Sequence, residues 1–392
     1  MPAGAAISLD IAATVAATAP RAVRLIATPP PRGAIQGMAT TRDRVLVQVL
    51  DLVKSRIAVA QPDGDGWRLQ PLGLPEHGSV AVVGADDHTD TALLNYEDFL
   101  TPTTLYLADG AAAPAPIKRL PAHIDAEPYV SEQRIATSAD GTEVPYFLLR
   151  ARDARPDGDV PTILYGYGGF EVSLTPGYVG PDRKAWLERG GAYAIANIRG
   201  GGEFGPAWHD AALKANRQRA FDDFYAVAEH LVASGLTRPR RLGIYGGSNG
   251  GLLVGAAVTQ RPALFGAAVC AVPLLDMLRY HKLLAGASWI GEYGDPDIPE
   301  ERAFIARYSP YQNVPVDGPM PKLFFWTSTR DDRVHPGHAR KMAAKLLEQG
   351  RDVLYYENTE GGHSAAADLL QLARRDALST VFFLRALADR AE

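Results

Sequence analysis

One serine of this sequence lies among glycines, at the border between two apolar segments. The run Gly246-Gly247-Ser248-Asn249-Gly250 fits the pattern G-x-S-x-G. The apolar residues before it predict a strand and those after it predict a helix, which is the setting of a nucleophile elbow. A serine at the tip of such a turn has strained backbone angles, and its neighbours must lack Cβ atoms to avoid clashes. We therefore interpret Ser248 as a nucleophile.

Two other interpretations of the glycine-rich turn stay open at this point. A phosphate-binding loop would need the lysine of G-x-x-x-x-G-K-[ST] or glycines spaced as G-x-G-x-x-G, and the sequence has neither here. A purely structural turn would need no partner residues elsewhere in the chain. A hydrolase would need an acidic residue and then a histidine, each after a later strand.

Candidate partners of the serine follow in the required order. Asp331 and Asp332 come soon after the apolar run "KLFFWTS", and His363 lies in a glycine-rich loop after the next run, "DVLYYEN". Ser248 would attack a carbonyl carbon, His363 would accept its proton and pass it to the leaving group, and the aspartate would orient the imidazole. The residues themselves leave Asp331 and Asp332 as alternatives for the acid.

This chemistry needs no metal and no cofactor, and we expect neither. His335 and His338 have the i, i+3 spacing of a ligand pair, but no acidic residue accompanies them on the same face. The single cysteine, Cys270, excludes an internal disulfide and a zinc site built from thiolates.

The elements that must position these groups alternate between strands and helices. A hairpin with its turn at Asp140-Gly141 opens this part of the chain. Strands are predicted near 162–165, 193–198, 242–245, 267–272, 323–327 and 353–357. Helices are predicted near 221–234, 250–260, 274–284, 337–348 and 365–387. This alternation favours an α/β fold with a mostly parallel, doubly wound sheet, whose catalytic groups lie at the carboxyl ends of the strands.

The part of the chain before this alternation has a different pattern. Six short β-rich runs, from "RVLVQVL" to "TTLYLAD", are separated by turn signals, as in a sandwich, a barrel or propeller blades. Six or seven strands would fill about one and a half four-stranded blades. We therefore expect an all-β region over residues 1–127 and a catalytic domain over residues 128–392.

Composition excludes several other classes of protein. Among 392 residues, 46% are apolar and 22% are charged, as in an ordinary globular protein, and the net charge of −5 argues against binding to nucleic acid or anionic lipid. No apolar run approaches the roughly 20 residues that span a bilayer, so we expect no membrane segment. The first residues lack a basic region and contain Asp10, which argues against a signal peptide. We expect a cytoplasmic protein, with export to the periplasm as the alternative.

From about Glu132 onward, the chain resembles the prolyl oligopeptidase family of serine peptidases, whose catalytic domain has the α/β-hydrolase fold. The segments that carry the resemblance are "LYGYGGF" (164–170), "ANIRGGGEFGPAWH" (196–209), "FDDF" (221–224), "YGGSNGGLL" (245–253), "DDRVHP" (331–336) and "GGH" (361–363). Asn249 and the spacing of Trp289 and Tyr293 resemble the branch that cleaves after proline, since an alanine usually follows the serine in the branch that cleaves after Arg or Lys. The resemblance implies an endopeptidase that hydrolyses short peptides after proline through an acyl-enzyme on Ser248.

The same resemblance implies a role for each matching residue. The catalytic acid would be Asp331, and the backbone N–H of Asn249 and the hydroxyl of Tyr167 would bind the oxyanion. Arg333 would bind the carbonyl group of the residue that precedes proline. The pocket for the proline ring would be formed by Phe170, Leu274, Trp289, Tyr293 and Val334.

The chain also departs from the pattern of the family. Family members carry a seven-bladed propeller inserted between an N-terminal segment and the hydrolase domain, whereas the residues before Ala122 resemble only its last one to two blades, and the N-terminal segment is missing. We expect uncovered surface and open strand edges, and hence self-association. Besides peptidase activity on peptide substrates, two hypotheses remain: a small-ester hydrolase that uses the same triad, and a truncated remnant that acts only by association.

Overall fold

The computed structural model describes residues 1–16 and 23–388, which divide into two compact units. The first unit contains residues 1–126 together with the short segments 173–179 and 202–208. The second unit contains residues 127–172, 180–201 and 209–392. Each unit has a hydrophobic core of its own.

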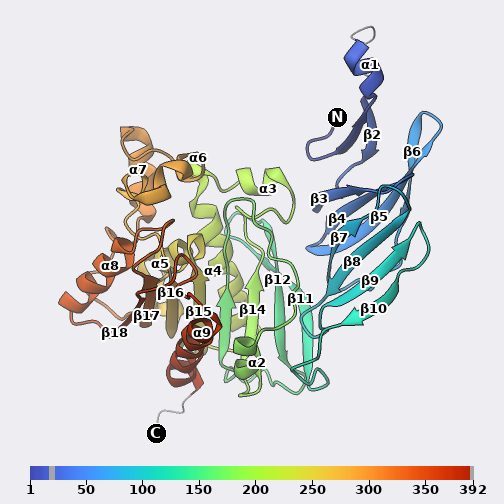
Figure 1. Cartoon of the computed structure of the whole chain (residues 1–392). Helices are drawn as coiled ribbons and strands as arrows, with labels where there is room; N and C mark the ends of the chain where they lie inside the picture. Colours follow the sequence, from blue (N-terminus) through green and yellow to red (C-terminus); the bar gives the residue numbers. More distant parts are fainter. Residues whose placement is uncertain (17–22, 389–392) are drawn as a thin grey trace. The chain divides into compact units, whose positions relative to one another are not determined.

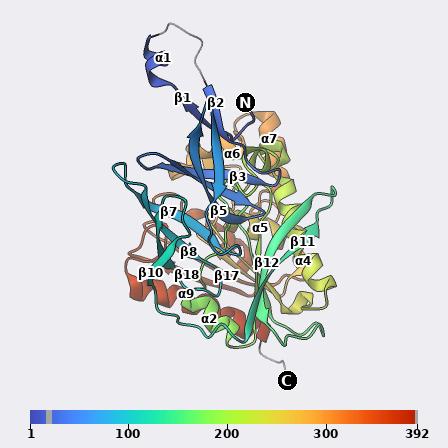
Figure 2. The same ribbon diagram turned by 90° about the vertical axis from the view of Figure 1, so that its right-hand side faces the viewer.

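The first unit is built from antiparallel strands (Figure 2). One four-stranded sheet contains β3 (Gly33–Thr40), β4 (Val45–Asp51), β5 (Lys54–Asp63) and β6 (Gly66–Pro71) in sequence order. The other contains β7 (Ser79–Ala85), β8 (Thr91–Glu97), β9 (Thr104–Asp109) and β10 (Ala115–Arg119). A separate hairpin pairs β1 (Ala6–Leu9) with β2 (Val23–Ala27), and α1 (Ile11–Ala16) follows β1. The two four-stranded sheets fit the predicted part of a propeller.

The prediction of six or seven strands in this region was too low. The sequence pattern missed the hairpin of β1 and β2, and it also missed β3, which contains two glycines, and β10, whose five residues are all exposed. Neither β3 nor β10 shows the clean alternation of apolar and polar residues that marks a half-buried strand. With both strands present, the region forms two complete four-stranded sheets instead of about one and a half.

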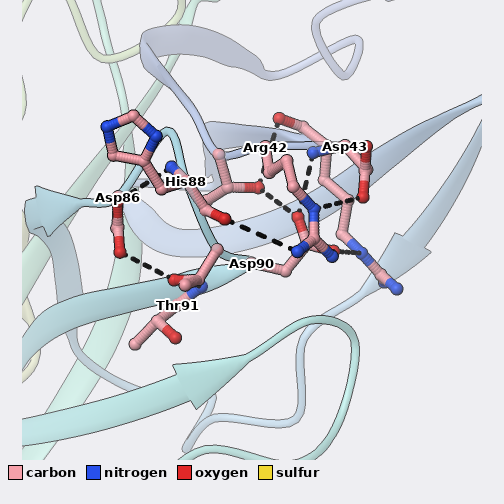
Figure 3. A network of polar contacts seen from close by, with 9 residues as sticks. Arg42, Asp43, Asp86, His88, Asp90 and Thr91 are labelled. Atoms are coloured by element: carbon pink, nitrogen blue, oxygen red, sulfur yellow. Dashed lines mark hydrogen bonds and ion pairs between the residues drawn. The ribbon is translucent and has the colours of Figure 1, made fainter.

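Two turns of the first unit, one from each four-stranded sheet, are connected by hydrogen bonds to the Asp90 side chain (Figure 3). One carboxylate oxygen of Asp90 accepts hydrogen bonds from the Thr41 hydroxyl at 2.9 Å and the Asp43 amide at 3.0 Å. The other accepts from Arg44 Nε at 3.3 Å. Burial alone would raise the pKa of Asp90, but these hydrogen bonds outweigh it and hold the pKa below its usual range. The carboxylate thus ties the β3–β4 turn to the β7–β8 turn.

The second unit is built around one eight-stranded sheet (Figure 1). The spatial order of its strands is β11 (Tyr129–Thr137), β12 (Glu143–Ala151), β14 (Ala192–Ala196), β13 (Thr162–Tyr165), β15 (Leu242–Gly247), β16 (Ala267–Ala271), β17 (Lys322–Ser328) and β18 (Val353–Asn358). The predicted hairpin is confirmed as β11 and β12, with Gly141 in its turn at φ +85°. From β14 to β18 every pairing is parallel, so the chain has the predicted α/β-hydrolase fold.

Helices cover both faces of this sheet, as its continuously apolar strands require (Figure 1). The main helices of the unit are α2 (Pro181–Leu187), α4 (Gln218–Ala233), α5 (Asn249–Gln260), α8 (Gly337–Glu348) and α9 (Leu369–Phe383). Helices α2 and α9 pack against each other, as do α4 and α5. Four helices had not been predicted from the alternating pattern: α2, α3 (Pro206–Asp210), α6 (Ile290–Tyr293) and α7 (Pro299–Tyr308). No helix in the described ranges 1–16 and 23–388 is long and apolar enough to cross a membrane.

The helix predicted at 274–284 is wrong, because side chains take the backbone groups that a helix would use. The amides of Leu275 and Asp276 donate to Nδ1 of His338 at 3.2 and 3.0 Å, and the Met277 amide donates to the Ser309 hydroxyl at 2.9 Å. Burial lowers the pKa of His338 to about 4, so the ring is neutral and can accept these bonds. The segment instead forms short 3-10 turns from residue 280 onward.

Candidate active site

Ser248 lies at the tip of a sharp turn between β15 and α5. Its φ of +59° is rarely adopted by a residue with a side chain. A Cβ atom on Gly246 would lie 2.2 Å from the carbonyl oxygen of Gly250, and one on Gly250 would lie 2.7 Å from the carbonyl oxygen of Gly166. The two glycines of the motif are therefore required by backbone contacts, and the turn projects the serine from the carboxyl end of a central strand.

The structure brings Asp331 and His363 together. Oδ2 of Asp331 lies 2.7 Å from Nδ1 of His363, while Oδ1 accepts hydrogen bonds from the amides of Arg333 at 3.0 Å and Val334 at 2.9 Å. The carboxylate is fully buried. Asp332 is exposed, so the geometry favours Asp331 as the acid.

The loop that carries His363 is held by a residue that the sequence did not reveal. Asn358, the last residue of β18, is buried and accepts hydrogen bonds from the amides of Glu360 at 2.8 Å and Gly361 at 2.7 Å. An asparagine at the end of a strand is a common turn former, and this was the only signal available. It fixes the start of the loop two residues before the histidine.

Two hydrogen-bond donors lie beside the serine. Tyr167 follows β13, and Asn249 is the first residue of α5, where a backbone N–H has no partner within the helix. Burial raises the pKa of the Tyr167 phenol, while Arg333, Arg217 and a hydrogen bond with Ser248 act against that rise. The phenol therefore keeps its proton at neutral pH. The start of α5 also favours negative charge.

The residues expected to form the pocket lie in one apolar cluster. Leu274, Tyr293 and Val334 are buried in it, and Phe170 and Trp289 pack against it with part of each ring exposed. The rings of Phe170 and Tyr293 meet edge to face, with their centres 5.7 Å apart. Arg333 is exposed on the loop between Asp331 and Val334. Its positive charge is close enough to Tyr167 to oppose the rise in the pKa of the phenol. All the predicted site residues therefore come from segments that follow strands of the sheet or lie at its carboxyl edge.

One group of side chains within residues 1–16 and 23–388 has metal-ligand spacing. The ligand atoms of His281, Asp295 and Asp297 lie within 4.8 Å of one another. The Asp297 carboxylate is already paired with Nζ of Lys282 at 2.9 Å and with Nε2 of His281 at 3.2 Å. The ammonium group of Lys282 on the same carboxylate would repel a metal cation. We therefore assign no metal to these three residues.

Comparisons with known proteins agree on one family. The sequence profile of the prolyl oligopeptidase family matches residues 180–390, and that of its N-terminal beta-propeller domain matches residues 17–117. An uncharacterized peptidase, y4nA, of Sinorhizobium fredii is 47% identical over 387 residues, which are 98% of this chain and 53% of that protein. A prolyl endopeptidase of Elizabethkingia meningoseptica is 36% identical over 324 residues, or 81% of this chain and 46% of that enzyme.

Solved structures give the same result. A post-proline cleaving enzyme from Rickettsia typhi matches with a TM-score of 0.90 and 36% identity, over 98% of this chain and 56% of that enzyme. Prolyl oligopeptidase B from Galerina marginata, bound to a macrocyclization substrate, matches with a TM-score of 0.90 and 28% identity, over 99% of this chain and 54% of that one. The chain spans about half the length of the relatives it matches.

Proposed function

The chain belongs to the prolyl oligopeptidase family, and from this premise we propose that it is a serine endopeptidase that hydrolyses short peptides on the carboxyl side of proline. The observation that carries the proposal is the pairing of buried Asp331 with His363 at 2.7 Å. This pair follows strands of the same sheet, at the same edge as the strained turn of Ser248. We assign residues 1–127 to part of a propeller and residues 128–392 to the catalytic domain.

The proposed reaction proceeds through an acyl-enzyme. Ser248 attacks the carbonyl carbon that follows the proline ring, and His363 accepts the serine proton and then donates it to the leaving amine. Asp331 orients the imidazole and stabilises its charged form. The Asn249 amide and the Tyr167 hydroxyl donate to the oxyanion as negative charge develops on it. Water then attacks the acyl-enzyme, with His363 again acting as the base.

Specificity for proline is proposed to come from the apolar cluster beside the serine. The edge-to-face pair of Phe170 and Tyr293 and the partly exposed ring of Trp289 offer flat apolar surfaces to a five-membered ring. Arg333 is exposed and always charged, so it is suited to bind the carbonyl group of the preceding residue. A pocket of this kind binds a compact apolar ring better than a charged side chain.

A two-step experiment tests the proposed function. Labelling of the 392-residue chain by a fluorophosphonate, with Ser248→Ala as the negative control, distinguishes an enzyme from a remnant that acts only by association. Enzyme from the same preparation that has not been labelled is then compared on a proline-containing peptide, the same peptide with alanine in place of proline, and a simple acyl ester. We expect labelling and preferential cleavage after proline. Hydrolysis of the ester alone would make the chain a small-ester hydrolase.

We predict that Tyr167→Phe lowers kcat about 10²–10³-fold and changes KM much less. The phenol donates mainly to the oxyanion, which exists in the transition state and not in the bound substrate. Steady-state kinetics on the proline-containing peptide measure both constants. Tyr165→Phe, two residues earlier at the end of β13, is the matched control and should change neither. An effect confined to KM would move Tyr167 from catalysis to substrate binding.

We also propose that this chain self-associates through an apolar surface of the second unit. Leu369 and Leu370 of α9 are 82% and 79% exposed, and a groove of about 480 Å³ between β18 and α9 is lined by Leu354, Leu378 and Val381. Leu369 and Leu370 lie near the start of α9, whereas Leu378 and Val381 of the groove lie near its end, so α9 carries exposed apolar side chains at both ends. Exposed apolar surface favours association.

Light scattering of Leu369→Lys/Leu370→Lys tests this surface. We expect the particle size of the variant to fall, whereas Val316→Lys, which replaces an apolar side chain that is 77% exposed and does not line the groove, should leave it unchanged. Wild-type protein that is monodisperse and monomeric would contradict the proposal.

A further inference from the structure

A buried ion pair lies next to the candidate site, and the mechanism above gives it no role. Arg217, which precedes α4, and Glu292 of α6 are 1% and 5% exposed, and Nη1 of Arg217 lies 3.0 Å from Oε1 of Glu292. Burying two charges costs free energy that their attraction often fails to recover, so such a pair is weak support for stability alone. Its contacts suggest another role.

Glu292 holds the loop that carries Tyr167 and Phe170. Its Oε1 accepts a hydrogen bond from the Phe170 amide at 3.1 Å, and its Oε2 lies 2.7 Å from Nε2 of His209. Phe170 and the residue after it both have φ of +56°, which is unfavourable for side chains of this size. Such a backbone persists only where its surroundings fix it. The carboxylate supplies one of these restraints, from an element 122 residues later in the chain.

Arg217 holds the other half of the site through the side chain of Asn249. The guanidinium donates to Oδ1 of Asn249, and the Tyr293 hydroxyl donates to the same oxygen at 2.7 Å. Nδ2 of Asn249 donates to the backbone carbonyl of Tyr167 at 2.6 Å. The guanidinium carbon also lies 5.2 Å from the centre of the Tyr293 ring. One amide side chain therefore joins both proposed oxyanion donors and one wall of the pocket to the arginine.

We propose that Arg217 and Glu292 are positioning residues that set the oxyanion site and the proline pocket together. The inference rests on the proposed function. Through Asn249 the pair fixes Tyr167, and through the Phe170 amide and the Tyr293 hydroxyl it fixes two walls of the pocket. A shift of either Arg217 or Glu292 therefore moves the oxyanion donors and the walls of the pocket together. Turnover and selectivity for proline should fall together when the pair is disturbed.

Two variants test this proposal, each with a matched control. Arg217→Lys keeps the buried charge but cannot donate to Asn249 and Glu292 in the same fork geometry. Its control is Arg219→Lys, at an exposed position two residues along. Glu292→Gln keeps the size of the side chain but removes its charge, and its control is Glu300→Gln, also exposed. Rates are divided by the amount of Ser248 titrated with a fluorophosphonate, so that unfolded protein does not count.

For both variants we expect kcat/KM per titrated site on the proline-containing peptide to fall about 10–100-fold, the size of effect that a misplacement of about 1 Å produces. We also expect the ratio of cleavage after proline to cleavage after alanine to fall at least about fivefold, which a loss of folded protein cannot cause. The controls should match the wild type. Rates and ratios within about twofold of wild type would overturn the proposal. It would also be overturned if no Ser248 could be titrated in either variant, because the pair would then be needed only for folding.

Failure of the proposed function would give a different result. Wild-type protein that cleaves an acyl ester but no proline-containing peptide would refute peptidase specificity, and the ester kcat per titrated site would still report on the oxyanion donors. A 10–100-fold loss in that kcat would support the network, and an unchanged kcat would overturn it.

Discussion

The Ser248→Ala variant is expected to lose hydrolytic activity by about 10⁶-fold, because alanine has no nucleophile and the other catalytic groups act only through it. Its fold should be unchanged. Alanine occupies less space than serine, and the strain at φ +59° belongs to any residue with a Cβ atom. Hydrolysis of the ester or peptide that the wild type cleaves, together with thermal unfolding, measures the two properties separately.

The matched control for this prediction is Ser288→Ala. Ser288 is exposed, lies next to Trp289 and donates only to the carbonyl of Ala285 at 2.6 Å. It should keep wild-type activity within about twofold, as expected for a surface substitution. Residual activity of Ser248→Ala above about one part in 10³ would mean that another residue is the nucleophile, and the turn would then be structural.

The sheet of the second unit could be predicted from the sequence because its strands are short and apolar, and the central ones are buried on both faces. Each of the six strands predicted after the hairpin has a counterpart within a few residues of the expected position. Helix 274–284 could not be excluded in the same way. Its residues are apolar enough for a buried helix, and the atoms that prevent it, on His338 and Ser309, lie far away in sequence.

The residues of the active site also differ in whether the sequence alone reveals them. Ser248, the acidic pair and His363 could be found because a hydrolase places them after strands in this order, here β15, β17 and β18, and their order is visible in the sequence. The choice of Asp331 needed the resemblance to the family, and the pairing with His363 now supports it. Arg217 and Glu292 gave no signal, since they are 75 residues apart and belong to no motif with a known mechanism. A buried contact of this kind can be recognised only once the folded arrangement of the chain is known.

The Asp331→Asn variant is expected to lose about 10⁴-fold in kcat, whereas Asp332→Asn should remain within about twofold of the wild type. The structure explains why a change of one atom has such an effect. Oδ1 of Asp331 accepts two backbone amides, from Arg333 and Val334. An asparagine at this position must keep its oxygen there, because its NH₂ group cannot accept a hydrogen bond from either amide.

The NH₂ group of that asparagine would then occupy the place of Oδ2 and point at Nδ1 of His363. Nδ1 would have to accept a hydrogen bond, so the imidazole would carry its proton on Nε2, the nitrogen that must accept the proton of Ser248. The wrong tautomer would therefore be the stable one, while both amide bonds and the fold would be kept. Asp332 is exposed and makes no such contact with the imidazole. Measurement of kcat for both variants, with unfolding curves to confirm that each is folded, decides the assignment, and equal losses would overturn it.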